Sequence, residues 1–272
     1  VRSSAASDVY KRQAKGRAAV LFSATLAPAG YYKDLCGLPD ARAVALRSPF
    51  DPANMGLWCA RQVSTRYKDR ADSIAKVSDL LDVMAAAQPG HYLAFFPSYS
   101  YLQQVWEDFT ARYPDQPTLC QESAMDEGQR TEFLAQFLAR DGKPLLGFAV
   151  LGGVFGEGVD LTGESLIGVA VVSPGLPQIG PRQEQLRDYF EETRGAGFDY
   201  AYRYPGMNKV LQAAGRVIRT PQDRGVVLLI DDRFLAPDTR RLMPPHWEHL
   251  RVVDSADAWK DELAAFWKKH EP

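Results

Sequence analysis

The chain has 272 residues, of which 46% are hydrophobic and 24% are charged. This is the profile of a soluble globular protein, long enough for one large or two small domains that each have a proper core. The formal net charge of −2 excludes a generally basic surface, so a nucleic acid would have to bind a local groove.

No apolar run reaches the length of a membrane span and no signal-peptide pattern is present, so we expect a cytoplasmic protein with no membrane partner. The three cysteines, Cys36, Cys59 and Cys120, lie far apart and follow no CxxC spacing. They are expected to be free thiols in a reducing compartment, and no metal site is predicted.

The N-terminal residues have no apolar period. Residues 3–13 (SSAASDVYKRQ) resemble the in-frame translation of a transposon-based sequencing adapter, and a disordered polar arm is the alternative. We therefore set residues 1–13 aside as an artefactual or disordered arm. On the adapter interpretation, the natural protein begins further upstream and this chain is a fragment.

From there on, short apolar runs alternate with helical periods. Strands are predicted over 17–23, 91–96, 118–121, 145–151, 166–172 and 225–230. Helices are predicted over 69–88, 99–112, 126–140, 178–195, 205–219 and 255–270, the last of them capped by Ser255. Apolar strands between amphipathic helices indicate an α/β fold with three layers, in which a mostly parallel sheet is covered on both faces. Such sheets place their sites at the carboxyl ends of strands.

The most informative segment is QAAGRVIR, near the end of the helix predicted over 205–219. At about 100° per residue, Gln212, Arg216 and Arg219 fall within roughly 60° of one another on a helix. Two guanidiniums one turn apart suit the charge that builds on a transferring phosphoryl group. The alternative is that the arginines form ion pairs with a nearby acid such as Asp231 or Asp232.

A glycine-rich loop follows the strand predicted over 145–151. Backbone N–H groups of such a loop can bind an anion, because glycine accepts positive φ. Glu157 and Asp160 add carboxylates to the loop, and a plain connecting turn is the alternative. Its glycines are Gly152, Gly153, Gly156 and Gly158.

Two further strand ends carry hydroxyl groups. Ser98 could cap the helix predicted over 99–112 and present its N-terminus to a phosphate, while Tyr99 could stack on a base. The alternative is a simple serine cap with a core aromatic. Ser23 and Thr25 could bond either a phosphate-linked network or only their own turn.

Taken in the order in which they occur along the chain, these segments resemble the motor core of superfamily-two helicases, and specifically the XPD/DinG group. The matching segments are Ser23–Leu26 for motif III, Phe95–Tyr99 for motif IV, Gly153–Asp160 for motif V and Gln212–Arg219 for motif VI. Asp232-Arg233-Phe234 after the last strand also resembles the ending of this group. The resemblance covers essentially residues 17–242.

The resemblance implies a RecA-like fold of the P-loop NTPase type. Residues 14–60 would hold the last strand of a first motor domain and a linker, and residues 61–272 the second RecA-like domain. ATP and Mg²⁺ would lie between the two domains of a 5′→3′ DNA helicase, in DNA repair or replication. Its partners would be single-stranded or forked DNA and the N-terminal motor domain of the same protein.

Residue roles follow from the motif positions. Arg219 would be the arginine finger, with Arg216 contacting phosphate or linking to Gln212. Ser98 would hold a DNA phosphate. The remaining nucleotide-binding and coupling positions implied by the motifs are Ser23, Thr25, Gly156, Glu157, Gly158 and Asp160.

A basic cluster lies outside these motifs. Arg61, Arg66, Lys68 and Arg70 surround a single acid, Asp69, and could track a DNA backbone, most directly through Arg66 and Lys68. A solvated surface strand and loop is the alternative.

Some features of the family are missing from the sequence. No GxxxxGK[ST] motif occurs, so the phosphate loop itself is absent. Asp126-Glu127 opens a helix and is interpreted as an N-terminal charge pair. An iron–sulfur cluster, if the parent protein has one, would belong to the missing part, since none of the three cysteines matches its ligands.

The sequence leaves two other classes of function as alternatives. One is a RecA-like module that binds nucleic acid or a partner without hydrolysis. The other is an unrelated α/β enzyme, which the absence of a GxSxG motif and the poor placement of the four histidines disfavour.

Overall fold

The computed structural model describes residues 18–138, 144–153, 155 and 166–269. The predicted N-terminal arm therefore lies outside the described residues, and so do Gly156, Glu157, Gly158 and Asp160. Among the described residues, no helix has both the length and the apolar composition that a membrane span requires.

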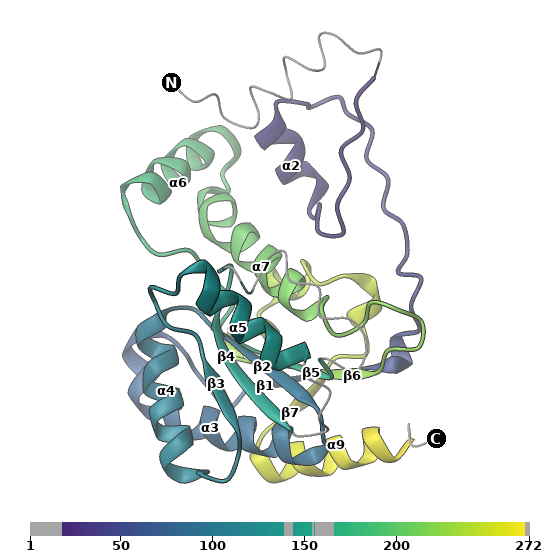
Figure 1. Ribbon diagram of the computed structural model, residues 1–272. Coiled ribbons are helices and arrows are strands. Elements are labelled where there is room, and N and C mark those ends of the chain that lie inside the picture. The colour runs from purple at the N-terminus through teal and green to yellow at the C-terminus, as the bar shows by residue number, and fades with distance from the viewer. Residues whose placement is uncertain (1–17, 139–143, 154, 156–165, 270–272) are drawn as a thin grey trace.

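One seven-stranded sheet forms the centre of the fold, in the order β3-β4-β2-β5-β6-β1-β7 (Figure 1). Every pair of neighbouring strands runs parallel. The strands are β1 (Met55–Ala60), β2 (His91–Phe96), β3 (Thr118–Cys120), β4 (Leu145–Val150), β5 (Gly168–Val172), β6 (Gly225–Ile230) and β7 (Arg251–Val253).

Helices cover both faces of this sheet. The α-helices are α2 (Ala29–Cys36), α3 (Arg70–Ala87), α4 (Tyr99–Arg112), α5 (Glu127–Leu138), α6 (Pro181–Arg194), α7 (Tyr204–Ala214), α8 (Pro237–Arg240) and α9 (Ala256–Lys269). A π-helical segment, η4 (Asp199–Arg203), precedes α7, and shorter 3-10 turns are η1 (Pro52–Asn54), η2 (Tyr67–Asp69), η5 (Asp232–Leu235) and η6 (Pro245–Trp247).

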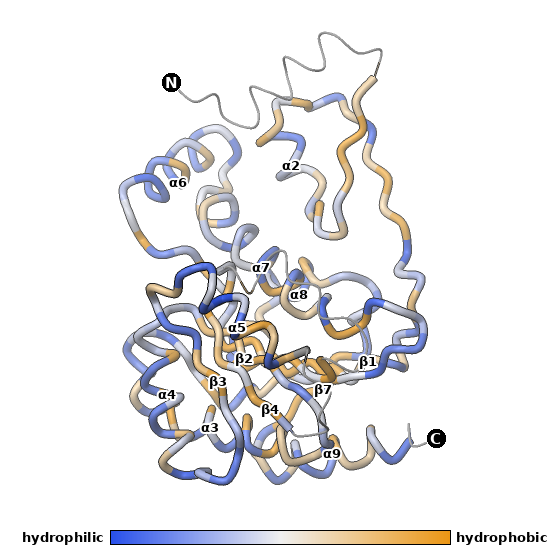
Figure 2. The backbone as a smooth tube through the Cα atoms, viewed as in Figure 1, coloured by the Kyte–Doolittle hydropathy of each residue, from blue (hydrophilic) through white to orange (hydrophobic). Residues whose placement is uncertain are grey.

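Two apolar cores lie on opposite faces of the sheet, because successive strand side chains point to opposite sides. On one face Tyr92 packs with residues of α3, α4 and α9, including Trp259. On the other face Leu93 packs with α5 and α7, through Phe133 and Val210. Figure 2 shows the apolar residues gathered on the central strands. The three-layer α/β fold predicted from the sequence is confirmed.

Two strands of the sheet, β1 and β7, were not predicted from the sequence. β1 pairs with β6 and β7, so residues 55–60 belong to this sheet and not to a linker. The sheet therefore begins at Met55, on the amino side of the boundary predicted at residue 60. The partners of both strands lie far away in the sequence, and local periodicity cannot reveal such pairing.

The strand predicted over 17–23 is not formed in its described part, residues 18–23. Residues 18–23 have no strand partner in the described sheet, and the side chains of Val20 and Phe22 are 82% and 89% exposed. A strand needs a neighbouring strand to satisfy its backbone groups, and the described residues offer none to this segment.

The connecting helix α2 docks on the layer formed by α6, η4 and α7 (Figure 1). Arg194 of α6 forms a bidentate ion pair with Asp34, at 2.9 and 3.1 Å. The hydroxyl of Tyr200 donates to the same carboxylate at 2.5 Å, and these two hydrogen bonds lower the pKa of Asp34. The side chain of Asn208 in α7 donates to the hydroxyl of Tyr32 at 2.7 Å. Helix α2 is therefore attached to this domain by polar contacts at two places.

Candidate nucleotide and nucleic-acid sites

Helix α7 connects the two edges of the sheet. In its first turn, Gly206 approaches Pro174 and Gly175, which follow the carboxyl end of β5, so closely that no side chain fits there. Past its last turn, Val217 packs against Gly225, the first residue of β6. The predicted catalytic arginines therefore lie at the amino edge of the sheet, opposite the edge where the sequence placed the sites of this fold.

The helix also ends earlier than predicted. α7 stops at Ala214, and Gly215 turns the chain toward β6. Gln212 stands in the last helical turn, whereas Arg216 and Arg219 follow it, so the three do not share a helical face. Arg216 is 6% exposed while Arg219 is exposed. The predicted helical arrangement of these three side chains is therefore not formed, and both arginines have interaction partners.

The loop that carries Arg219 is held by one carboxylate. Asp223 accepts hydrogen bonds from the backbone N–H groups of Arg219 and Thr220, at 2.8 and 2.7 Å. Its second oxygen accepts from the hydroxyl of Thr220 at 2.8 Å. The backbone of Arg219 is thereby fixed while its side chain stays at the surface. This is the arrangement that a guanidinium needs if it is to reach a ligand on another domain.

The described part of the glycine-rich loop lies at the carboxyl edge. Gly152 has φ +74°, and the methylenes of Lys209 from α7 lie where its side chain would be. Gly153 donates to the carbonyl of Val150 at 3.1 Å, which makes a tight turn. The proposed coupling residues Gly156, Glu157, Gly158 and Asp160 follow in the undescribed part, and their roles stay predictions.

Ser98 and Tyr99 stand at the same edge, after β2. The hydroxyl of Ser98 accepts from the N–H of Tyr101 at 3.4 Å, so the serine caps α4. The side chain of Tyr99 is 37% exposed, and its hydroxyl accepts from the side chain of Gln121 at 3.0 Å. The cap is confirmed, and contact of either residue with DNA stays a prediction.

The basic cluster after β1 is largely offset by acids and local contacts. Arg66 pairs with Asp232 at 2.6 Å, and Arg61 pairs with Asp254 at 2.5 Å. Arg70 lies over the ring of Tyr101 and donates to the backbone carbonyl of Thr65, at 3.3 Å. Lys68 is exposed. Much of the cluster is thus engaged in local ion pairs and hydrogen bonds.

A buried network that the sequence analysis did not single out follows β6. Asp231 is fully buried, and Arg233 binds both of its oxygens, at 2.7 and 2.9 Å. The same carboxylate accepts from the N–H of Thr65 at 2.9 Å and from its hydroxyl. Arg233 also reaches the hydroxyl of Ser173 at 3.4 Å. The network joins the ends of β1, β5 and β6.

The environment of Asp231 decides its charge. Burial by itself would raise the pKa, but the hydrogen bonds and the positive charge of Arg233, with the bonds from Thr65, outweigh it and lower the pKa. The carboxylate therefore stays ionised at neutral pH. The sequence signal for this network is the segment Asp231-Asp232-Arg233 directly after a buried strand. The family resemblance includes part of this segment but implies no ion pair between Asp231 and Arg233.

Asp231 and Asp232 were also the acids considered as alternative partners of the motif VI arginines. In the structure Asp231 binds Arg233, and Asp232 binds Arg66.

The hydroxyls of Ser23 and Thr25 are hydrogen-bonded to each other at 3.3 Å, and the N–H of Thr25 donates to the hydroxyl of Ser23 at 3.2 Å. The local turn is therefore formed, and a role in a nucleotide network stays a prediction for both residues.

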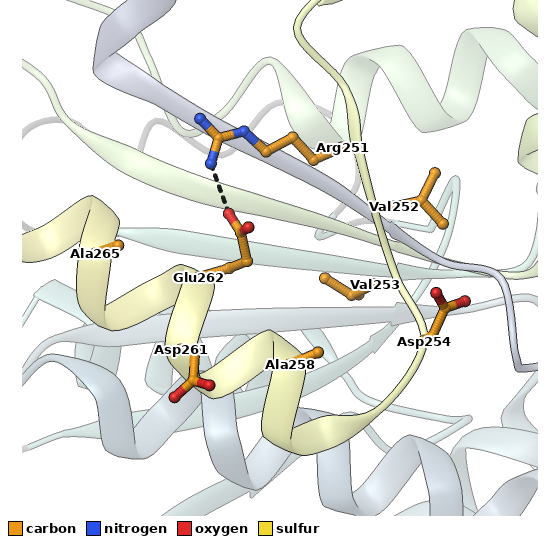
Figure 3. A pocket seen from close by; sticks show the side chains of 8 residues that line it. All are labelled: Arg251, Val252, Val253, Asp254, Ala258, Asp261, Glu262 and Ala265. Carbon is orange, nitrogen blue, oxygen red and sulfur yellow. Dashed lines mark hydrogen bonds and ion pairs between the residues drawn. The ribbon is translucent and has the colours of Figure 1, made fainter.

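A groove between β7 and α9 lies apart from these sites (Figure 3). Its acid Glu262 is bound by Arg251 at 2.6 Å and by the indole N–H of Trp58 at 3.2 Å. The exposed side of the groove is lined by Val252 and Asp261. None of the predicted site residues lines it.

Two solved structures share this fold. The chain superposes on an apo structure of XPD with a TM-score of 0.66 and 18% identity, covering 85% of this chain and 47% of that one. It superposes on S. cerevisiae Dbp5 bound to RNA and ADP-BeF3 with a TM-score of 0.55 and 17% identity, covering 93% and 55%. The fold is that of a RecA-like helicase domain.

Sequence relatives define the family. Residues 81–250 match the family described as Helicase C-terminal domain. The regulator of telomere elongation helicase 1 of Bos taurus is 29% identical over 93% of this chain, and the ATP-dependent DNA helicase YoaA of Escherichia coli is 27% identical over 75% of it. The chain belongs to the helicase C-terminal domain family, in its XPD/DinG-like group. It spans 23% and 31% of the length of these two relatives.

Proposed function

We propose that the chain is the C-terminal motor domain of an ATP-dependent 5′→3′ DNA helicase that acts in DNA repair or replication. The observation that carries this is the presentation of Arg219. Its backbone is clamped by Asp223, it is exposed at the amino edge of the sheet, and it ends a motif VI segment in a chain of this family.

The proposed chemistry is the stabilisation of phosphoryl transfer from outside the phosphate site. Charge spreads over the γ-phosphate oxygens in the transition state, and a planar guanidinium can bind two of them at once. ATP and Mg²⁺ would be held mainly by the first motor domain. Among the described residues, no group of three or more His, Cys, Asp and Glu side chains is arranged to hold a metal.

Because the phosphate loop is missing, we expect the 272-residue chain alone to hydrolyse no ATP. An arginine finger has nothing to act on without a phosphate cradle. Phosphate release measured with and without single-stranded DNA should stay at background. DNA-stimulated turnover that Arg219→Ala abolishes would contradict this division of labour between the domains.

The DNA strand is proposed to cross the carboxyl edge of the sheet. Ser98 and Tyr99 stand there after β2, and Arg66 and Lys68 follow the carboxyl end of β1. The capped N-terminus of α4 and the exposed ammonium of Lys68 both favour a phosphate. Partners of the whole protein would be single-stranded or forked DNA.

Charge reversal tests this path. Lys68→Glu should weaken binding of the chain to a labelled single strand by about tenfold at low salt, and the loss should shrink as salt rises. Arg66→Glu should act in the same direction but should also destabilise the fold, since Arg66 binds Asp232. Fluorescence anisotropy measures the affinities. The control is Lys268→Glu near the end of α9, and equal effects at positions 68 and 268 would refute a defined path.

A further inference from the structure

The side chain of Gln121 links three strand ends at the carboxyl edge. Gln121 directly follows β3 and is 5% exposed. Its Oε1 accepts a hydrogen bond from the backbone N–H of Val150, at the end of β4, at 2.7 Å. Its Nε2 donates to the hydroxyl of Tyr99, at the start of α4, at 3.0 Å. Both ends of the amide are therefore engaged.

These contacts determine the hydrogen-bonding role of the Tyr99 hydroxyl. A backbone N–H can only donate, so the contact with Val150 identifies the oxygen end of the amide and turns its NH₂ end toward Tyr99. The phenolic oxygen accepts from Gln121, and its own proton remains for another acceptor. Within the part of the chain that the structure describes, no group receives that proton. Tyr99 is therefore poised as a donor toward a ligand.

The neighbouring groups favour an anionic acceptor. The turn at Gly152 and Gly153 lies beside this pair, with Nε2 of Gln121 3.7 Å from the position of a Cβ at Gly153. The side chain of Lys209 packs on Gly152, and its Nζ lies 3.3 Å from the position that a Cβ at Gly152 would occupy. The N-terminus of α4 opens at the same edge. A phenolic donor, an ammonium group and a helix N-terminus suit a phosphate better than a base carbonyl.

We infer that Gln121 is a positioning residue that holds Tyr99 as a hydrogen-bond donor to a backbone phosphate of the bound single strand. The inference rests on the proposed function and deepens it. Stacking on a base would need only the aromatic ring of Tyr99, whereas this role needs its proton and the orientation of the Gln121 amide.

Two substitutions separate these possibilities. Tyr99→Phe keeps the ring and removes the proton, and should weaken binding of the full 272-residue chain to a labelled oligothymidylate by about tenfold. Gln121→Glu keeps an oxygen for the N–H of Val150 but presents a second oxygen that takes the proton of Tyr99. It should weaken binding by at least as much.

The double variant separates two effects of Gln121→Glu: the reversed direction of its hydrogen bond with Tyr99 and the added negative charge. In the Tyr99→Phe background there is no hydroxyl proton for the carboxylate to accept, so Gln121→Glu can weaken binding only through its negative charge. The loss of affinity should therefore be several-fold smaller than in the wild-type background. Hydrogen exchange of the Val150 amide should be unchanged in Gln121→Glu, which shows that the structural contact persists. A merely structural role of Gln121 would give additive losses.

Other outcomes overturn the inference in distinguishable ways. If Tyr99→Phe binds like the wild type while Lys68→Glu weakens binding, the DNA path stands and the inference fails, with the ring alone contacting the strand. Additive effects of the two substitutions would also refute it. If the wild-type chain binds no single strand at all, the proposed DNA contact falls and this inference falls with it.

Discussion

Replacing Arg219 with alanine should lower the ATP turnover of the intact helicase, with both motor domains present, by about a thousandfold. An arginine finger acts on charge that develops in the transition state, so kcat should fall while the KM for ATP changes little. Arg219→Lys should recover only a small part of the rate, because an ammonium group cannot bind two phosphate oxygens in one plane. Steady-state phosphate release with saturating single-stranded DNA measures both parameters.

A matched control keeps this prediction specific. Arg182→Ala removes an exposed arginine from α6, which lies at the other end of α7, and should leave turnover unchanged. Asp223→Ala frees the loop but keeps Arg219, so we expect an intermediate loss of kcat. If turnover of Arg219→Ala stays within about twofold of the wild type, Arg219 is not the finger.

The second large effect is on stability. Asp231→Ala should lower the free energy of unfolding by about 3–5 kcal/mol, because it leaves the Arg233 guanidinium in a mostly buried site without its carboxylate. Urea unfolding of the chain measures the loss. Asp254→Asn is the control, since its ion pair with Arg61 is exposed and should be worth less than about 1 kcal/mol. Equal losses at the two sites would contradict the assignment.

The same pair predicts a pH dependence with a definite sign. The pKa of Asp231 is lowered in the folded protein, so its stabilisation is complete above the unfolded pKa, about 3.9, and disappears as pH falls through the folded value. Asp231→Asn should therefore differ most from the wild type near neutral pH, and the two stability curves should converge in acid. A difference that stays constant down to low pH would show that the charge of Asp231 is not what stabilises the network.

Much of the fold could be predicted from local pattern alone. The strand at His91–Phe96 and the helix at Tyr99–Arg112 were predicted with the bounds they have, because a proline and a serine cap mark their junction. β1 was not predicted from MGLWCA, and its pairing with β6, which is distant in the sequence, is not visible in a local window. Local signals identify elements, and pairing over such distances is decided by the whole sheet.

The candidate site was harder to predict for the same reason. The helical pattern around QAAGRVIR continues past Ala214, but α7 ends there and Gly215 turns the chain toward β6. Arg216 is buried as a result, whereas Arg219 is exposed. The roles of Gln121 and Arg233 depend on partners from other strand ends. Motif order in the sequence pointed to the correct family, whereas the positions of individual side chains depended on contacts that no local window contains.

The docking of α2 has a mechanical consequence for this domain. Because Asp34 binds Arg194 and Tyr200, helix α2 is attached to this domain and is expected to move together with it. Since β1 belongs to the sheet of the same domain, the long stretch between Cys36 and Met55 joins two parts of a single body and would not serve as a hinge between two bodies.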